Sequence, residues 1–339
     1  MRKILHIVTY MSLLFLNACD IHEWPESFPP ETESRIHLRL NYETDMTKWE
    51  HVYVESSVVE QALGETYDNH LEHGKIRYII RTYPISESKH RIREHIHEFV
   101  FTKDIADGYD HEATLDIQPG NYNILIWSDL VESEDDEHFY DAYDFSEIIL
   151  RSDNQCNNNY RDAFYGKIEN ISIEPNYDNI IDTIDITMKR PLAKFEIVAN
   201  DFSTFMRTEP FNFDKSNIAS YKVLIQYTGF MPNAYSLFTG KPVDASAGLV
   251  MESSLNLLNE DDVSLGFDYV FVSESVSSVT IRIGVYDNEG SQVSLTETIK
   301  VPLKANHHTI LSGNFLMQNT SGGIDINPDF DGNHNIIVP

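Results

Sequence analysis

The sequence predicts an all-β protein built from two tandem β-sandwich domains. Apolar and polar residues alternate with a period of two in many short runs, starting with Ile36, Leu38 and Leu40. This period places one set of side chains on a core face and the other set in water. Turn residues separate the runs at short intervals, which is typical of sandwiches and barrels. With 339 residues, 41% of them hydrophobic, the chain is long enough to bury two cores.

The first 18 residues predict a lipoprotein signal peptide. A short basic start precedes a mostly apolar stretch over residues 4–16, a layout typical of a secretory signal. The stretch is too short to span a hydrocarbon layer of about 30 Å comfortably. It ends in the run Leu16-Asn17-Ala18-Cys19, which resembles a bacterial lipobox, although Asn17 is not the usual small residue. We therefore expect Cys19 to be lipidated and to become the mature N-terminus. The alternative is an ordinary signal peptide followed by a chance cysteine.

Residues 19–34 predict a lipidated cysteine followed by an extended acidic linker. Three prolines lie in this segment, and proline fixes φ and removes a backbone donor. The whole chain has 25 Lys and Arg against 54 Asp and Glu, for a net charge of −29. Such a charge repels phosphate backbones, so we expect no nucleic-acid partner. It also repels anionic lipid, so contact with a membrane should come from the lipid anchor alone.

Alternating runs define the first predicted domain, residues 35–190. Its clearest turn is Gln118-Pro119-Gly120-Asn121, which separates two strands. Its clearest helical candidate is residues 54–63, where four apolar side chains share a helical face. The predicted strands of this domain are residues 36–42, 76–81, 95–103, 113–118, 121–128, 145–150, 164–173 and 180–189.

The second predicted domain covers residues 191–339. Arg190-Pro191 separates two alternating runs, and proline is poorly tolerated inside a central strand, so we place the boundary there. Two domains of about 150 residues each have a normal domain size. Residues 287–290 predict a hairpin turn that joins 279–286 to 292–301. The predicted strands are residues 192–200, 220–228, 248–258, 264–272, 278–286, 291–301 and 308–317.

The motifs of common enzyme classes do not occur in the sequence. It has no GxSxG, P-loop, GxGxxG or HExxH pattern, so we expect no catalytic residue and no cofactor. An enzyme with paired carboxylates stays an alternative, because 54 acids always supply some pair. His95 and His97 share one face of a predicted strand, but no further ligand is identifiable, so we expect no metal site. The acidic segment 129–147 predicts a solvated loop, with calcium binding as the alternative.

Cys156 and Thr183 are residues for which the sequence allows a statement about covalent modification. Cys156 has no cysteine to pair with if Cys19 is acylated, so the fold cannot depend on an internal disulfide. Asp182-Thr183-Ile184 fits a short O-glycosylation pattern of exported bacterial proteins, which makes Thr183 a candidate glycan site. The alternative is a strand threonine selected for its β propensity.

Several local stretches, taken in order, resemble one family across nearly the whole chain. The resemblance is to the anchor subunits of Bacteroidia type V fimbriae, lipoproteins related to the fimbrillins. Besides the lipobox and the acidic linker, it rests on the following stretches: Pro119-Gly120-Asn121-Tyr122, Tyr160-Arg161-Asp162-Ala163-Phe164-Tyr165-Gly166, Lys189-Arg190-Pro191-Leu192-Ala193-Lys194-Phe195-Glu196, Val301-Pro302-Leu303-Lys304, Asn314-Phe315-Leu316, and Gly323-Ile324-Asp325-Ile326 followed by Phe330-Asp331-Gly332.

The resemblance implies two transthyretin-like β-sandwiches and assembly by strand exchange with fimbrial shaft or accessory subunits. In such an assembly, backbone hydrogen bonds provide affinity and alternating side chains fill pockets in the partner. It also implies a lipid anchor in the outer membrane and exposure on the cell surface. Shaft subunits of this family lose an N-terminal strand to an arginine-specific protease, which makes Arg35 and Arg39 candidate processing sites. The alternative is that both are solvent-facing strand residues, as their alternation with apolar neighbours indicates.

The leading hypothesis is therefore a non-enzymatic cell-surface lipoprotein that anchors or caps a fimbrial filament. We expect residues 309–317 and 335–338 to be partner-pairing strands, because both are alternating and near the C-terminus. The alternative is a surface glycan-binding lipoprotein of the starch-utilisation type. That alternative predicts an exposed row of aromatic side chains from Trp24, Trp49 and Trp127.

Overall fold

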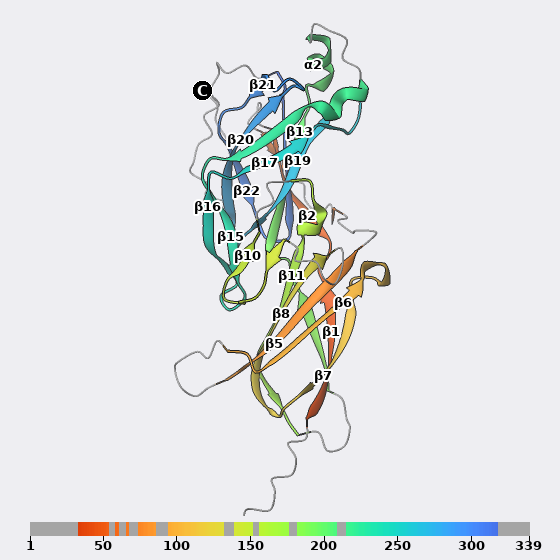
Figure 1. Ribbon diagram of the computed structural model, residues 1–339, viewed down its shortest axis with the longest axis vertical. Coiled ribbons are helices and arrows are strands. Elements are labelled where there is room, and N and C mark those ends of the chain that lie inside the picture. Colours follow the sequence, from red (N-terminus) through yellow and green to blue (C-terminus); the bar gives the residue numbers. More distant parts are fainter. Residues whose placement is uncertain are drawn as a thin grey trace, which may run out of the picture.

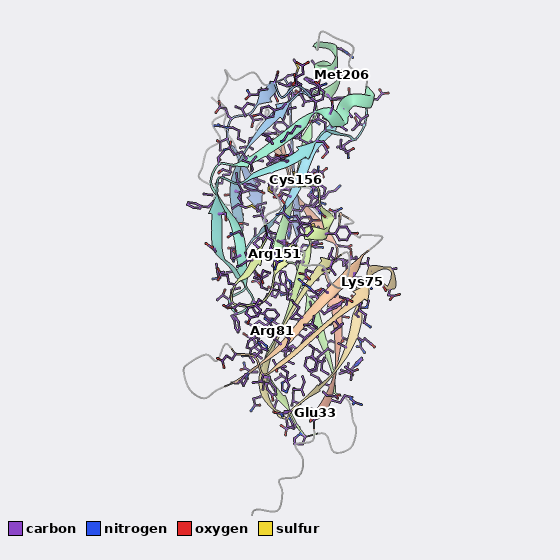
Figure 2. All side chains as sticks on the ribbon, viewed as in Figure 1. Glu33, Lys75, Arg81, Arg151, Cys156 and Met206 are labelled. Carbon is purple, nitrogen blue, oxygen red and sulfur yellow. The ribbon has the colours of Figure 1, made fainter. Side chains whose placement is uncertain are left out.

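Strands dominate the computed structural model, which confirms the all-β fold class. The structure describes residues 33–53, 58–60, 66–67, 74–85, 94–131, 139–151, 156–175, 182–208 and 215–317. Figure 1 shows an elongated molecule in which two groups of sheets follow each other along the long axis. Figure 2 places Glu33 near one end of the molecule and Met206 near the other.

The first group of sheets is a sandwich formed by strands between Ser34 and Met188. One sheet has three strands in the order β12-β1-β7 and the other has four in the order β11-β8-β5-β6. Their bounds are β1 Ser34–Tyr42, β5 Lys75–Pro84, β6 His97–Asp104, β7 His111–Ile117, β8 Gly120–Val131, β11 Ala163–Ile173 and β12 Asp182–Met188.

Strict alternation explains how β1 and β7 form one face of this sandwich. Ile36, Leu38 and Leu40 of β1 are buried, whereas Arg35 and Arg39 between them face solvent. Every second residue of β7 is buried in the same way. β1 pairs antiparallel with β7 and parallel with β12, so it is the central strand of its sheet. A one-residue slip would turn its apolar residues into water, so the pattern fixes the register.

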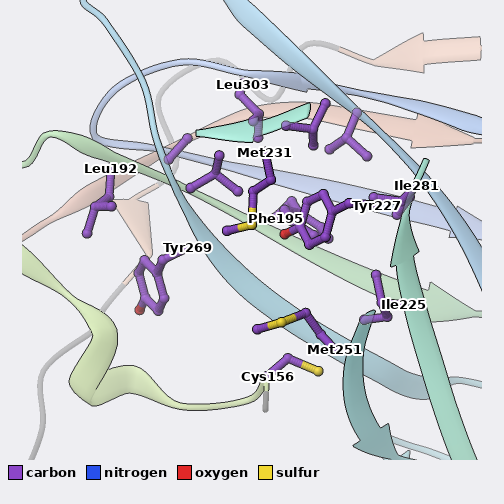
Figure 3. Packing of buried hydrophobic residues seen from close by; sticks show 14 of the residues in the cluster. Cys156, Leu192, Phe195, Ile225, Tyr227, Met231, Met251, Tyr269, Ile281 and Leu303 are labelled. Atoms are coloured by element: carbon purple, nitrogen blue, oxygen red, sulfur yellow. The ribbon is translucent and has the colours of Figure 1, made fainter. Parts of the chain in front are cut away.

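The second group contains two further sheets around a larger core. One sheet has the order β18-β19-β13-β23-β2-β3, with β4 also paired to β2, and the other has the order β17-β14-β20-β21, with β22 also paired to β20. Figure 3 shows side chains from several of these strands meeting in the core, among them Phe195, Tyr227 and Ile281. The bounds are β2 Met46–Tyr53, β3 Val58–Glu60, β4 Thr66–Tyr67, β13 Leu192–Ala199, β14 Lys222–Tyr227, β17 Val250–Ser254, β18 Asn256–Leu257, β19 Val263–Phe271, β20 Ser277–Tyr286, β21 Gln292–Leu295, β22 Ile299–Leu303 and β23 His307–Gly313.

A fifth sheet joins residues from both halves of the chain. It has the order β16-β15-β10-β9, where β9 Tyr140–Asp141 and β10 Ile148–Leu150 precede residue 190, and β15 Phe230–Ser236 and β16 Lys241–Ala247 follow it. β2 also crosses in this direction, because it pairs parallel with β23. Strands β2, β9 and β10, which precede residue 190, thus complete sheets whose other strands follow it. The division of the chain into two domains at residue 190 stays a prediction.

Strands β5 and β8 are buried on both faces along much of their length. Ile80 and Ile126 point into the sandwich core of the first group. Ile79 and Trp127, their neighbours in sequence, belong to the larger core of the second group. The two groups of sheets are therefore held together by apolar packing on either side of one shared sheet.

The helical segments are short. They are the 3₁₀ turns η1 Ile105–Asp107, η2 Asn159–Arg161 and η3 Lys215–Ser220, and the helix α2 Phe202–Thr208. The Asn158 side chain caps η2 by accepting a hydrogen bond from the Tyr160 amide. Within the described ranges, no helix has the length and apolar composition needed to cross a membrane.

Several local predictions are corrected by the structure. The helix expected over 54–63 is wrong at residues 58–60, which form β3; the β-branched pair Val58 and Val59 suits a strand paired with β2. The strand expected over 291–301 is split into β21 and β22 at Thr296, whose hydroxyl oxygen accepts a hydrogen bond from the Ile283 amide. Strands β2, β15 and β16 were not expected, because their sequences lack strict alternation and the last two contain proline.

Candidate functional site: the buried junction and the strand edges

The stretches around residues 160 and 190 meet in a buried junction. Arg190 lies at its centre and donates from Nε and Nη2 to the two carboxylate oxygens of Asp162, at 2.6 and 2.8 Å. The same guanidinium donates to the Thr44 carbonyl at 2.8 Å and to the Asn306 side chain. Its Cζ lies 4.6 Å from the centre of the Phe164 ring. This one side chain therefore ties four segments of the chain together.

A second buried ion pair joins η2 to β19. Arg161 Nη1 lies 2.5 Å from Asp268 Oδ1, and both residues are 1% exposed. The Tyr227 hydroxyl donates to the other oxygen of Asp268 at 2.7 Å. Burial, together with the negative charge of Asp268, raises the pKa of Tyr227 well above its ordinary value. The Tyr140 hydroxyl donates to the Arg161 carbonyl at 2.5 Å and so satisfies that buried backbone oxygen.

Lys194 is the third buried cation of the junction. Its Nζ donates to Asn159 Oδ1 at 3.1 Å and lies 4.1 Å from the centre of the Phe267 ring. The Tyr269 hydroxyl donates to the same Asn159 oxygen, also at 3.1 Å. Burial lowers the pKa of the Lys194 amine to about 8. Unlike a surface lysine, this amine sits in a low-dielectric environment next to an amide carbonyl.

The junction gives the residues around 160 and 190 an architectural role. Their charged side chains are buried against partners from the same chain, so they do not form a surface for a ligand. Lys194 and Glu196 alternate with Ala193, Phe195 and Ile197 in the sequence, a pattern that predicts solvent exposure for the two charged residues. In the structure almost all of β13 is buried on both faces. The residues around 160 and 190 were singled out in the sequence by their resemblance to family motifs, and not by their alternation.

Arg35 and Arg39 are solvent-facing residues of the central strand β1, as their alternation predicts. Their side chains are 57% and 47% exposed. Arg35 pairs with Asp116 of β7 at 2.7 Å, and Arg39 pairs with Asp185 of β12 at 2.9 Å. Because the backbone of β1 is paired on both sides, neither arginine lies in an extended loop that a protease could bind.

The proposal that residues 309–317 pair with a partner is not supported for the part that forms a strand. β23 pairs parallel with β13 on one side and parallel with β2 on the other. Both of its edges are therefore occupied within the chain. After the strand, the amides of Leu316 and Met317 donate to the buried carboxylate of Asp201, at 3.0 and 2.7 Å. The other predicted pairing segment, 335–338, lies outside the described residues.

Open strand edges do occur elsewhere. Within the described ranges, no strand pairs with the outer edge of β7, β6 or β16. β16 carries Lys241 and Pro242, two residue types that protect an edge from further pairing. β7 has no lysine or proline and alternates strictly between buried and exposed residues. Of the edges of β7 and β16, the edge of β7 is the better suited to accept another strand.

The remaining predicted site residues are placed as follows. Thr183 is exposed on β12, opposite His37 in the register, so its hydroxyl is accessible. Cys156 is buried, which raises the pKa of its thiol to about 12. Cys19 and Trp24 lie outside the described residues, as does the side chain of Trp49. Trp127 is fully buried and cannot belong to an exposed aromatic row.

Two histidines and one acidic residue singled out by the sequence lie within the described ranges. His97 contacts Thr82, with 2.9 Å between Nδ1 and the hydroxyl oxygen, and His95 lies 3.8 Å from Glu98. Among the residues that the structure describes, no group of three or more His, Cys, Asp or Glu is arranged to hold a metal ion. Asp129, expected in a solvated loop, is instead buried in β8. It accepts two hydrogen bonds from Arg77, at 2.8 and 2.6 Å.

Solved structures from Bacteroides and Porphyromonas species match much of this chain at low sequence identity. A candidate adhesin from Bacteroides ovatus is 11% identical, with a TM-score of 0.42, and the match covers 79% of this chain and 82% of that one. A candidate cell adhesion protein from Bacteroides eggerthii is 9% identical, with a TM-score of 0.41 and coverage of 90% and 94%. The fimbrial anchor protein Mfa2 from Porphyromonas gingivalis is 10% identical, with a TM-score of 0.37 and coverage of 77% and 82%.

No curated protein matches this chain. A family model does match, and it covers residues 30–339, which is nearly everything after the predicted signal peptide and linker. The chain therefore belongs to the family described as a family of unknown function, DUF6562.

Proposed function

We propose that this protein is a non-enzymatic lipoprotein of the cell surface that anchors or caps a fimbrial filament by β-strand complementation. The predicted lipid on Cys19 would hold it in the outer membrane, and the acidic linker would separate the fold from the lipid surface. Fimbrial shaft or accessory subunits would be its partners. The sequence resemblance given by the lipobox, the linker and the ordered motifs supports this assignment.

The path of residues 34–53 is the observation that carries the proposal. This segment contributes β1 to the first group of sheets, where it lies between β12 and β7. It then contributes β2 to the second group, where it pairs with β23. Both groups are therefore completed by one continuous N-terminal segment, directly after the linker. A subunit that keeps this segment stays joined to its lipid, as an anchor requires.

Because β1 and β2 fill their own places, a partner strand must pair at another edge. The outer edge of β7, on the side away from β1, fits this role. No described strand pairs with that edge, and the side chains of β7 alternate strictly between buried and exposed. Pairing there would extend the β12-β1-β7 sheet by β-augmentation. The charged residues on its outer face, Glu112 and Asp116, are already neutralised in part by Arg39 and Arg35.

The test is an edge-blocking substitution. Thr114→Lys places a charge on an exposed position of β7, and edge lysines oppose strand pairing. The matched control is Ala245→Lys at an exposed position of β16. We expect the first variant to lose most of the fimbrial subunits that co-purify with the wild type, and the control to keep them. Equal co-purification by both variants would exclude β7 as the docking edge.

The glycan-binding alternative predicts exposed side chains for Trp24, Trp49 and Trp127, and the burial of Trp127 contradicts this prediction. That alternative required exposed aromatic platforms, and Trp127 instead packs in the core against Tyr140, with ring centres 5.3 Å apart. We therefore do not propose glycan binding as a second function.

A further inference from the structure

Lys194 and Asn159 form an unusual pair in the buried junction. The two residues are 35 positions apart and come from different elements, β13 and η2. Lys194 is fully buried, and its Nζ lies 3.1 Å from Asn159 Oδ1. Asn159 is partly exposed, so a small leaving group has a route to solvent. An amine and a carboxamide are thus held together in a largely apolar site.

The surroundings increase the neutral fraction of the amine and polarise the carbonyl. The faces of Phe267 and Tyr269 lie 4.1 and 5.3 Å from Nζ and keep water away from it. Because burial lowers the pKa of Lys194 to about 8, roughly a tenth of the amine is neutral at pH 7. The Tyr269 hydroxyl donates to the Asn159 oxygen, where negative charge develops when a nucleophile adds to the carbonyl.

Proximity is the largest contribution that the fold can make to such a reaction. Two groups held in contact react with effective molarities of about 10⁵ M or more when they are well oriented. Here the ion pairs of Arg161 and Arg190 fix η2 against the start of β13.

We propose that Lys194 and Asn159 form an intramolecular isopeptide bond. The neutral Lys194 Nζ adds to Asn159 Cγ, so the Nζ–Cγ bond forms and the Cγ–Nδ2 bond breaks. One proton of the amine passes to Nδ2, and ammonia leaves; no oxidant or co-reactant is needed. The product would link η2 covalently to β13 across the junction.

Mass spectrometry of the purified full chain tests this directly. We expect the intact mass to be lower, by one ammonia, than the mass of the chain with its processed and lipidated N-terminus, and a digest to contain one branched peptide that includes both residues. The decisive measurement is made on the wild type, so a variant that fails to fold does not affect it. A full-mass protein with separate peptides for Lys194 and Asn159 would overturn the proposal, as would an ammonia loss that maps elsewhere.

Two variants sharpen the result. Asn159→Ala and Lys194→Met should each abolish the ammonia loss. Asn200→Ala is the matched control, because Asn200 directly follows β13 but is exposed and donates to Asp262, at 2.7 Å. The control should keep both the ammonia loss and the branched peptide.

Discussion

Buried cations define the chemistry of this protein at the scale of single residues. Arg161 and Arg190 are each at most 2% exposed, and each is paired with a buried carboxylate, that of Asp268 and that of Asp162. Removing such a charge from water is costly, and the partner repays that cost only when the geometry is good. Loss of one member therefore leaves an uncompensated buried charge.

The Arg161–Asp268 pair gives the first prediction. Arg161→Met should reduce the free energy of unfolding by about 3–5 kcal/mol, because Asp268 stays buried without its cation. Urea denaturation measures the loss. The control is Arg35→Met, which breaks the exposed, solvent-screened pair with Asp116 and should reduce the free energy of unfolding far less. Similar losses in the two variants would mean that the buried pair is not important for stability.

His308 gives a prediction for pH. Burial lowers its pKa below the ordinary value, although Glu196, 3.4 Å away, acts in the opposite direction; the charges of Lys194 and Lys48 lower it further. The folded state thus prefers the neutral ring. This contribution to stability is present above the ordinary histidine pKa of about 6.5 and is lost as pH falls through the folded value.

The measurement is the melting temperature between pH 8 and pH 5. The wild type should become less stable toward pH 5, and His308→Gln should show a smaller decrease. The decrease should not vanish, because burial also lowers the pKa of His97, His111 and His307. Parallel curves for the two proteins would contradict the assignment to His308.

Sequence reasoning was weakest for these same residues. A period of two identifies one buried and one exposed face, so it assigned Lys194 to solvent. Packing on both faces of β13 reversed that assignment, and such packing depends on strands far away in the sequence. The exposed arginines of β1 were predicted correctly, because only one face of that strand meets a core.

At the scale of elements, β1 decides whether the N-terminus is retained. We expect the folded protein to resist an arginine-specific protease at Arg35 and Arg39, because both lie within a strand that is hydrogen-bonded on its two sides. Digestion followed by N-terminal sequencing checks this. The same protein in denaturant should be cut at both positions. Rapid cleavage of the native protein at either arginine would favour a shaft-like subunit.

Strict alternation predicted four strands that have one buried face, and the apolar runs of β13 and β19, which are buried on both faces, were predicted as well. β1, β7, β14 and β20 alternate cleanly, and their expected bounds agree with the structure to within a few residues. β15 and β16 could not be recognised, because their prolines and polar residues are compatible with a strand only at or near a sheet edge. The expected pairing role of β23 was wrong because pattern alone does not show which edges the chain itself occupies.

At the scale of the whole molecule, the two groups of sheets share a core and exchange strands. Trp127 and Leu125 of β8 face the second group, and Met46 and Val52 of β2 are buried within it. A pull on the lipid end would therefore act on both groups through residues 34–53. Such a continuous path suits a protein that holds a filament to a membrane, and it could not be derived from the sequence because it depends on long-range pairing.

The central claim is that lipid on Cys19 tethers a filament to the cell through this fold. The most direct measurement compares cells that produce the wild type with cells that produce Cys19→Ala, analysed for lipid on the protein, for co-purifying fimbrial subunits and for filaments in the medium. We expect lipid and filament subunits on the wild type, and an unlipidated variant whose filaments are shed into the medium. Filaments that stay on the mutant cells, or a lipidated wild type that captures glycan or outer-membrane transporters instead of fimbrial subunits, would contradict the account.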